Sequence, residues 1–425
     1  MLLHKLFEYT NSLGIKCCSL KNNHQLEGTL VGDRDLDLYV HVKDHEEFAK
    51  ILCEFGFKYF TLSGVDIEGI EHYYGYCSEQ MKLMHIQWYK KIFTGNSLVK
   101  EYNFQDPEDW LFVNSFEYIK GLLIPEARVQ KAIYLLREVI KSQTITGRIL
   151  VKKEYVDYEL EKVYVFPQDK FSDNSPDVIV VKNNFSCEGV IAYRRFNAAK
   201  ILLLEVSAVF VRLVYKLLSF NKKRREAGLV IGITGSDGSG KSTLVHNLLY
   251  MFNGNFRATT IHIGRPTNIS FGTKVESKST SFRDFKSIVL ALFRVLLAIK
   301  AQVYKYFGYL VIVDRCLGSV VGTPDSPRIE GHNMVSRFLS KVERKLYHLA
   351  PRFDVVYKLD VNVENALERN QQRIKVDKET DDEIRFRHNV SGKMKFLAVD
   401  VVIVNANESE SNVLLFVSND MWSRT

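Results

Sequence analysis

A glycine-rich segment carries the clearest chemistry in the sequence. Residues Gly235–Thr243 read GSDGSGKST and fit the pattern GxxxxGK[ST] of a phosphate-binding loop, or Walker A motif. Glycines let the backbone curl so that its N–H groups point inward at phosphate oxygens. Lys241 can reach the β- and γ-phosphates, and the Ser242 hydroxyl can ligate Mg²⁺. The residues expected to bind nucleotide are Gly235, Ser236, Gly238, Ser239, Gly240, Lys241, Ser242 and Thr243.

The context of this segment favours a ligand site over the alternative, a glycine-rich turn that binds nothing. The apolar stretch LVIGIT leads into it and the helical stretch KSTLVHNLLYMF leads out, as the motif requires. Asp314 ends another apolar run, Tyr309–Val313, and Arg315 follows it. An acid at the end of such a strand can hold Mg²⁺ directly or through water. We therefore expect Ser242 and Asp314 to be the metal ligands, with Arg315 beside them.

A second pair of acids lies near the N-terminus. Asp35 and Asp37 belong to GDRDLDLYV, residues 32–40. Alternate residues of a strand point to one face, so both carboxylates can share Mg²⁺. The alternative is two surface aspartates on an ordinary strand.

The C-terminal half alternates strands and helices. Apolar runs predict strands at Leu229–Thr234, Thr259–Ile263, Tyr309–Val313, Val355–Leu359 and Val401–Val404. Helices are expected at Lys241–Phe252, Phe282–Tyr306, Asn333–His348, Val363–Asn370 and after Glu408. This α/β alternation predicts a five-stranded parallel sheet with helices on both faces, whose ligands bind at the carboxyl ends of the strands.

The N-terminal half predicts an α+β domain with a helical extension. A first helix is followed by strands at Ile15–Leu20 and Asp35–Val42, a helix at Asp44–Phe55 and a strand at Met81–Tyr89. Helices are expected at Glu108–Leu123 and Pro125–Lys141, whereas Tyr155–Val190 gives a mixed pattern. The expected domains are residues 1–190, a helix and basic linker at 191–227, and residues 228–425.

The linker contains an amphipathic helix. In Asn197–Phe220, Glu205, Arg212 and Lys216 share one helical face. We expect this helix to pack on one of the domains. The alternative is peripheral contact with an anionic membrane, which the basic run KKRR at 222–225 favours.

Composition describes an ordinary globular chain. Its 425 residues are 46% hydrophobic and 25% charged, with a formal net charge of +8. That charge is modest for the length and no basic cluster dominates, so no nucleic-acid partner is expected. The six cysteines form no CxxC pair, which favours free thiols in the cytoplasm over a zinc site or disulfides. The apolar stretch at the N-terminus is too short for a secretory signal.

From about Gly228 onward the sequence resembles thymidylate kinases. The resemblance rests on GSDGSGKST, on VIVDRC at 311–316, on Tyr357–Arg387 and on IVNANESESNV at 403–413. It implies that Asp237 faces the sugar of the acceptor nucleotide and that Arg315 grips the acceptor's phosphate. It also implies that Ser319 falls on a family serine. The arginine-bearing lid would hold Arg369 and Arg373, with Arg373 the foremost candidate to act on the transferring phosphoryl group. The alternative for these arginines is a solvated helix with ion pairs.

Two departures from that family concern the acceptor. The family's Arg-Glu-Pro turn appears as Gly264-Arg265-Pro266, and VVGTPDSPR follows Ser319 where an aromatic residue and a glutamine usually hold the thymine base. A site built to hydrogen-bond a base depends on those partners. The phosphate chemistry is therefore expected to persist while the acceptor has changed.

The acidic strand near the N-terminus resembles the metal-binding strand of nucleotidyltransferase-fold proteins. The family's glycine-serine turn is replaced by SLKNNH at 19–24, and Gln87 stands where a third acid is expected. We expect a binding or degenerate domain of that fold, with active nucleotidyl transfer as the alternative.

Together these patterns predict an ATP- and Mg²⁺-dependent kinase that acts on a phosphate-bearing acceptor, either dTMP or another nucleoside or sugar phosphate. One alternative is a nucleotidyltransferase with a regulatory kinase-like half. Another is a membrane-associated nucleotide-binding protein of surface-polysaccharide synthesis. The expected location is the cytoplasm, with attachment at the inner membrane and assembly into a homodimer left open.

Overall fold

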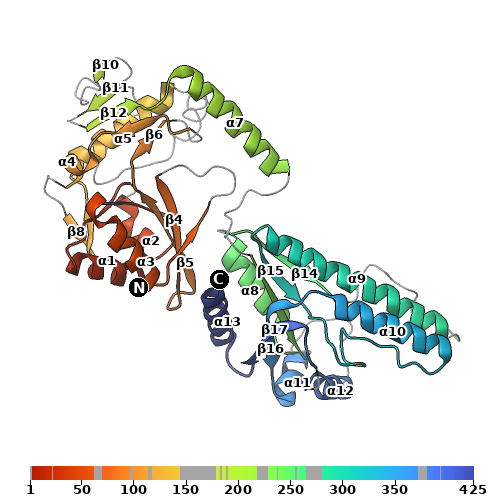
Figure 1. Cartoon of the computed structure of the whole chain (residues 1–425). Coiled ribbons are helices and arrows are strands. Elements are labelled where there is room, and N and C mark those ends of the chain that lie inside the picture. Colours follow the sequence, from red (N-terminus) through yellow and green to blue (C-terminus); the bar gives the residue numbers. More distant parts are fainter. Residues whose placement is uncertain are drawn as a thin grey trace. The chain divides into compact units, whose positions relative to one another are not determined.

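The chain folds into two compact units, Met1–Lys223 and Arg224–Thr425, which divide inside the expected linker. The computed structural model (Figure 1) describes residues 2–21, 23–61, 69–95, 99–112, 117–143, 179–181, 184–187, 190–217, 228–236, 238–253, 256–264, 280–371, 381–392 and 394–425. Most of the mixed segment Tyr155–Val190 and the basic run 222–225 lie outside these residues.

The N-terminal unit contains two sheets. Its helices are α1 (Leu2–Ser12), α2 (Leu26–Leu30), α3 (His45–Glu54), α4 (Pro107–Leu111), α5 (Ala127–Gln143) and α7 (Ala198–Leu217). Its strands are β1 (Cys17–Ser19), β2 (Leu36–Val40), β3 (Lys58–Phe60), β4 (Ile70–Cys77), β5 (Lys82–Tyr89), β6 (Phe93–Thr94), β7 (Tyr102–Phe104), β8 (Glu117–Ile119), β9 (Leu122–Ile124), β10 (Ile179–Val181), β11 (Asn184–Cys187) and β12 (Val190–Arg194). The larger sheet has the order β3-β4-β5-β2-β1-β9-β8, and the smaller has the order β10-β11-β12-β7-β6.

The prediction of a helix at Glu108–Leu123 is wrong. The short helix α4 ends at Leu111, and the antiparallel strands β8 and β9 follow it. Lys120 and Gly121 connect those strands with φ angles of 52° and 82°. A two-residue turn with both φ angles positive matches the twist of a hairpin. A Cβ on Gly121 would meet the backbone of Phe7 at 2.5 Å, so only glycine fits there.

The linker helix is present as α7, but its apolar face is not packed as expected. Leu202, Leu203, Val206, Val209, Phe210 and Leu213 are each 55–68% exposed. Ile201 and Ala208 are buried. Among the described residues, α7 therefore presents a largely uncovered apolar surface.

The C-terminal unit is built on a parallel sheet. Its strands are β13 (Leu229–Gly235), β14 (Ala258–His262), β15 (Leu310–Asp314), β16 (Phe353–Asp360) and β17 (Ala398–Asn405). Its helices are α8 (Lys241–Asn253), α9 (Thr280–Tyr306), α10 (Met334–Leu349), α11 (Val363–Gln371), α12 (Asp381–Gly392) and α13 (Glu410–Arg424). The strand order is β14-β15-β13-β16-β17, and every pairing is parallel. The predicted five-stranded parallel sheet is confirmed.

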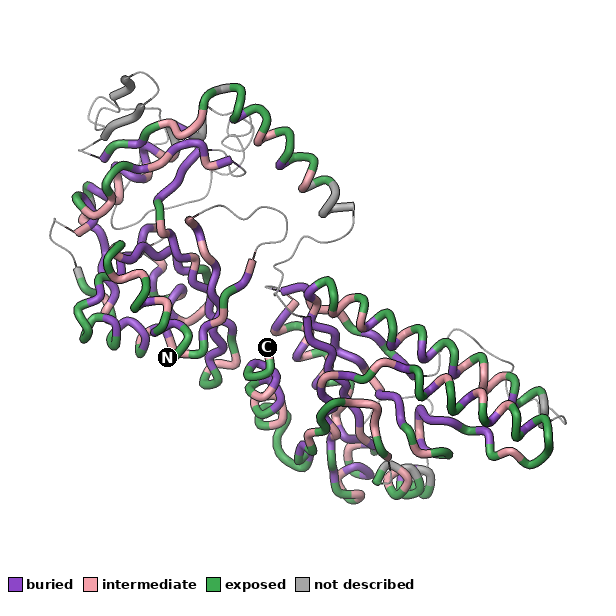
Figure 2. Tube along the Cα trace, in the orientation of Figure 1, coloured by how far each residue is buried: buried purple, intermediate pink, exposed green. Residues whose placement is uncertain are grey.

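Helices cover both faces of this sheet, as predicted. Helices α8 and α13 lie on one face, and α9 and α10 lie on the other (Figure 1). Val230, Val311, Val313 and Val356 point from the strands into the core shared with α9. Figure 2 shows the central strands buried, whereas much of α9 and α10 is exposed. This two-sided burial explains why these strands are continuous apolar runs.

One helix among those described is long and apolar enough to cross a membrane, judged by length and composition alone. It is the segment Phe282–Tyr306 of α9.

Candidate functional site

The phosphate-binding loop connects the central strand of the parallel sheet to a helix. Strand β13 ends at Gly235, and α8 begins at Lys241. The loop therefore opens at the carboxyl edge of the sheet, where ligands of such folds bind. The Lys241 ammonium folds back and donates to the carbonyl of Ser236 at 2.6 Å. Ser239 N–H donates to the same carbonyl at 3.3 Å, which holds the curl of the loop.

Two glycines of the loop sit where a side chain would collide with backbone. A Cβ on Gly235 would lie 2.7 Å from the carbonyl oxygen of Leu359 on β16. A Cβ on Gly238 would lie 2.7 Å from the carbonyl oxygen of Ala366 on α11, and its φ is +84°. Gly240 has a similar φ of +87° but open space around it. The loop is thus packed against β16 and α11, the element that precedes the expected lid.

Gly238→Ala is expected to lower the free energy of unfolding by about 1–3 kcal/mol, because the left-handed backbone and the Ala366 contact both oppose a side chain. Gly240→Ala is the matched control, since it adds left-handed strain of about 1 kcal/mol without a collision. Urea unfolding of both variants in the absence of nucleotide measures the difference. Equal loss in the two variants would contradict the close packing of Gly238.

Asp314 lies beside the loop and has one oxygen available for a ligand. Its partner across the sheet is Ile233 of β13, two residues before Gly235. One carboxylate oxygen contacts His262 Nδ1 at 2.9 Å, and the other, Oδ1, is buried and has no hydrogen-bond partner among the described residues. A buried orphan carboxylate oxygen next to a phosphate-binding loop suits Mg²⁺, which prefers oxygen ligands and retains waters and substrate phosphates. Asp314 therefore fits the expected metal, and the role of the Ser242 hydroxyl as the other protein ligand stays a prediction.

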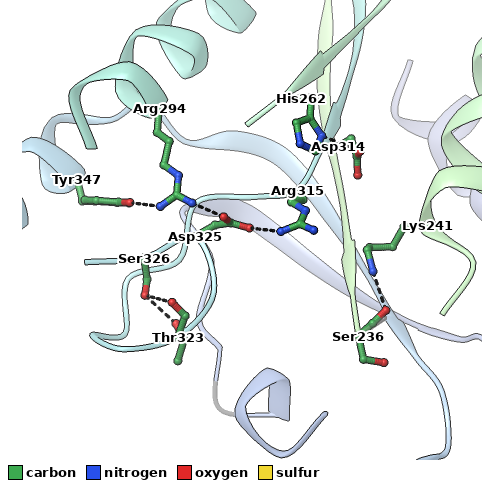
Figure 3. A network of polar contacts seen from close by, with 10 residues as sticks. All are labelled: Ser236, Lys241, His262, Arg294, Asp314, Arg315, Thr323, Asp325, Ser326 and Tyr347. Atoms are coloured by element: carbon green, nitrogen blue, oxygen red, sulfur yellow. Dashed lines mark hydrogen bonds and ion pairs between the residues drawn. The ribbon is translucent and has the colours of Figure 1, made fainter. Parts of the chain in front are cut away.

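Arg315 is held by a buried ionic network (Figure 3). Its φ is 68°, which is unusual for a residue with a side chain, and its N–H donates to the carbonyl of Ile233 at 3.1 Å. Its guanidinium lies 3.8 Å from an oxygen of Asp325 and is 41% exposed. Arg294 of α9 reaches Asp325 from the opposite side and also donates to the Tyr347 hydroxyl at 2.9 Å. Arg294 is 1% exposed, so this network is part of the core.

The segment after Ser319 is folded into the protein. Thr323, Asp325 and Ser326 are all buried. The Thr323 hydroxyl contacts the Ser326 hydroxyl at 3.0 Å, and Asp325 adopts a φ of 56°. This is the position at which the resemblance to thymidylate kinases would imply an aromatic residue and a glutamine that bind the base. Here it supplies a carboxylate that faces two arginines.

The remaining expected residues of the kinase site are not brought together among the described residues. Arg369 donates to the carbonyl of Ala406 at 2.8 Å, which ties α11 to the end of β17. Ser319 contacts the carbonyl of Lys395. Asp237, Arg265 and Arg373 lie outside the described residues. The catalytic roles of Asp237, Arg369 and Arg373 stay predictions.

The strand expected at Asp35–Val42 is shorter in the structure: β2 begins at Leu36, so Asp35 directly precedes it and Asp37 lies within it, and each acid has its own cationic or polar partner. Asp37 is 4% exposed and pairs with Lys21 Nζ at 2.8 Å. Asp35 contacts His85 Nδ1 at 2.7 Å. Burial, partly offset by Asp37, lowers the pKa of Lys21. Gln87 lies beside Asp37 in the pairing of β2 with β5 and donates to the Tyr89 hydroxyl at 2.8 Å.

A buried histidine pair extends this polar face. His85 contacts His72 at 3.0 Å between ring nitrogens, and Tyr74 stacks on His85 with ring centroids 4.3 Å apart. Among the described residues, no group of three or more His, Cys, Asp or Glu could hold a metal ion. The shared metal at Asp35 and Asp37 stays a prediction, and the geometry gives both carboxylates other partners.

Three residues that take part in the polar contacts around Asp314 and Arg315 were not identified from the sequence. They are His262, Arg294 and Asp325. Arg294 interrupts the apolar run at residues 288–299, and this was an available signal, because a cation buried in a core needs a partner. The partner itself is 31 residues away and could not be identified from local spacing.

Comparison with known proteins supports the kinase assignment of the C-terminal unit. Residues 233–415 match the family described as thymidylate kinase. No curated protein matches the sequence. The similar solved structures include deoxyadenosine kinase from M. mycoides with bound dCTP, at 13% identity and a TM-score of 0.28 over 46% of this chain and 100% of that chain. The same enzyme with bound dATP is 14% identical with a TM-score of 0.28, over 45% and 98% of the two chains. The family match supports a nucleotide-kinase type of phosphoryl transfer.

Proposed function

We propose that the C-terminal unit transfers a phosphoryl group from ATP, with Mg²⁺, to an acceptor that already carries phosphate. The observation that carries this proposal is the meeting of three groups at one edge of the sheet. The Lys241 loop leaves β13, and Asp314 and Arg315 end the neighbouring strand β15. The Lys241 loop and Asp314 suit the ATP phosphates and their Mg²⁺, and the guanidinium of Arg315 suits the phosphate of a second substrate.

The chain's own groups divide this work between binding and charge neutralisation. The loop N–H groups and the start of α8 bind the β- and γ-phosphates, and Lys241 neutralises the oxygens of the transferring group. Arg315 binds the phosphate of the acceptor, bidentately where geometry allows. Ser242 and Asp314 would hold Mg²⁺, which when bound would further neutralise the phosphate oxygens. Phosphoryl transfer depends mainly on such positioning and charge.

The acceptor is either dTMP or another nucleoside or sugar phosphate. The buried carboxylate of Asp325 lies next to Arg315, and the segment VVGTPDSPR lacks the aromatic and amide groups expected for a thymine base. A base loses specific recognition when its hydrogen-bonding partners are missing. This favours an acceptor other than thymidylate, recognised mainly by its phosphate.

The test gives the purified full chain ATP that is radiolabelled in its γ-phosphate and measures where the label goes. Acceptors are offered singly: dTMP, the other nucleoside monophosphates and a series of sugar phosphates. We expect Mg²⁺-dependent transfer of label to at least one of them, and its loss on adding EDTA. Label that is released only as inorganic phosphate, whatever acceptor is present, would contradict the kinase assignment.

For the N-terminal unit we infer a binding role. Asp35 and Asp37 lie two residues apart at the start of β2, and this pair of acids keeps nucleotidyl transfer as a second candidate function. Lys21 and His85 already contact those carboxylates, and Gln87 stands in place of a third acid. A missing carboxylate weakens deprotonation of an attacking hydroxyl.

The double variant Asp35→Asn/Asp37→Asn is expected to leave ATP consumption by the C-terminal unit within about twofold of the parent, because both carboxylates belong to the other compact unit, which has a core of its own. Incorporation of each of the four labelled nucleotides into product is measured alongside. Incorporation by the parent that disappears in the variant would replace the binding role with nucleotidyl transfer.

A further inference from the structure

His262 lies beside Asp314 at the carboxyl edge of the parallel sheet. It is the last residue of β14, and the register pairs it with Asp314, the last residue of the neighbouring strand β15. Paired residues of adjacent strands point to the same face of a sheet. The histidine is not among the residues that the sequence predicts for the kinase site, yet it contacts the carboxylate that fits Mg²⁺.

The hydrogen bond between the two side chains has a defined direction. His262 Nδ1 lies 2.9 Å from Asp314 Oδ2. An ionised carboxylate can only accept a hydrogen bond, so Nδ1 carries a proton and donates it to Oδ2. Figure 3 shows the imidazole and the carboxylate turned toward each other. This bond holds one oxygen of Asp314 and leaves the other for a different partner.

The backbone around Asp314 is held by both neighbouring strands. Its carbonyl accepts from the N–H of Ile263 at 3.1 Å, and the N–H of Arg315 donates to the carbonyl of Ile233 at 3.1 Å. The main freedom left to Asp314 is therefore rotation of its side chain. Because His262 anchors Oδ2, it also sets the direction of Oδ1, the buried oxygen that has no hydrogen-bond partner in the part of the chain that the structure describes.

Gly264 leaves the space in which the imidazole lies. A Cβ at this position would be 2.4 Å from His262 Nε2 and 2.9 Å from Cδ of Arg315. A side chain there would displace one or both of these groups. The turn Gly264-Arg265-Pro266 has glycine where the resemblance to thymidylate kinases implies the arginine of Arg-Glu-Pro. The departure from that family at residue 264 thus makes room for the histidine.

We propose that His262 is a positioning residue of the Mg²⁺ site, which holds Oδ2 of Asp314 so that Oδ1 is presented to the metal ion. This role rests on the Mg²⁺ site of the proposed kinase function. Carboxylates that bind metal ions are themselves hydrogen-bonded, and loss of such a partner weakens metal binding by about 10–100-fold. The imidazole acts through Asp314 and not as a ligand, because Mg²⁺ takes oxygen ligands.

The rival explanation is an ordinary ion pair at the protein surface, which contributes little to stability. The His262 side chain is 49% exposed, which suits such a pair. Asp314 does not suit it, because its side chain is 24% exposed and its Oδ1 is buried. A buried carboxylate oxygen that lacks a donor is costly unless a ligand binds it. A surface pair also predicts that loss of the imidazole leaves metal binding unchanged, which can be measured.

The experiment titrates MgCl₂ into the purified full chain loaded with ADP and follows the melting temperature, which rises as a ligand binds the folded state. Its dependence on free Mg²⁺ gives the metal affinity, and no acceptor is needed. His262→Phe keeps a flat ring without the donor and is expected to bind Mg²⁺ about 10–100-fold more weakly. His262→Asn keeps an N–H donor at nearly the same reach as Nδ1 and is expected to bind Mg²⁺ nearly as tightly as the parent.

Two further variants and one further measurement complete the design. His262→Ala removes the donor without adding bulk and is the second donor-free variant. His348→Phe, at an exposed histidine of α10, is the matched control and should keep the parental Mg²⁺ affinity. Circular dichroism establishes that each variant is folded. Calorimetry with ADP in EDTA should give the parental affinity for every variant, because His262 acts only through the metal ligand.

Parental Mg²⁺ affinity in both donor-free variants would overturn the proposal and leave the proposed kinase function intact. Equal weakening in His262→Phe and His262→Asn would also overturn it, since the donor would then not be the group that matters. Weaker binding of ADP in EDTA by the donor-free variants would assign His262 to the nucleotide instead. A parent whose melting temperature with ADP does not respond to Mg²⁺ would overturn the proposed metal site and the role of His262 together.

Discussion

Replacing Lys241 with alanine is expected to lower the rate of ATP turnover by a factor of about 10²–10³ or more, because one preorganised charge on the transferring group is lost. The Lys241 ammonium is the group of the loop that can follow the γ-phosphate through transfer. In the structure it donates to the Ser236 carbonyl at 2.6 Å, so it lies beside the loop.

The fold should survive this change. The Ser236 carbonyl keeps the hydrogen bond from Ser239 N–H, and Lys241 is only half-buried. We therefore expect a melting temperature close to that of the parent in the absence of nucleotide. Lys345→Ala, an exposed lysine of α10, is the matched control for loss of one positive charge and should retain parental turnover.

Turnover is measured as labelled ADP formed with and without acceptor. A folded Lys241→Ala protein that works at the parental rate would remove the loop from the reaction. Loss of turnover together with unchanged nucleotide binding would show that Lys241 acts in transfer more than in binding, since a group used only in the transition state lowers kcat with little change in KM.

The parallel sheet could be predicted because its strands are buried on both faces. Runs such as Leu229–Thr234 are continuously apolar, and the glycine-rich loop fixes where the first of them ends. Strand β13 and helix α8 accordingly lie within one residue of their expected ends. Asp314 and Arg315 could be placed for the same reason, since they directly follow such a run.

The hairpin β8–β9 could not be predicted as readily. Its strands are three residues each, and its turn places Lys120, a poor former of left-handed backbone, at positive φ. Gly121 gave the one local signal. Helix α12 was also missed, because Asp381–Gly392 is mostly polar and its one buried apolar side chain among those described is Ile384. In both segments tertiary contacts outweigh local propensity.

The ionic network at the site was hidden for a different reason. Arg294 lies on α9, Asp325 lies in an irregular segment and Arg315 follows a strand, so their meeting depends on the packing of three elements. Local sequence patterns report periodicity and turns, and they contain no information on such distant pairs. The same network leads to the second prediction with a large expected effect.

Asp325→Ala is expected to lower the free energy of unfolding by about 3–5 kcal/mol, because it leaves the buried guanidinium of Arg294 without its carboxylate. Arg294 is 1% exposed and its Nε has no partner in the part of the chain that the structure describes, where only the Tyr347 hydroxyl would remain bound to the guanidinium. Asp325→Ala/Arg294→Leu is the decisive companion. It removes both charges and fills the site with an apolar side chain, which for buried pairs is often neutral or stabilising.

Urea unfolding of the full chain gives the stabilities, and hydrogen exchange in α9 assigns the loss to the C-terminal unit. We expect the double variant to regain most of what Asp325→Ala loses, which is the signature of a coupled pair. Equal destabilisation by the single and double variants would contradict a paired Arg294. In the double variant Arg315 still lacks the carboxylate at 3.8 Å. A stable double variant with a raised KM for the acceptor and an unchanged KM for ATP would therefore assign Asp325 the task of positioning Arg315, apart from its contribution to the core.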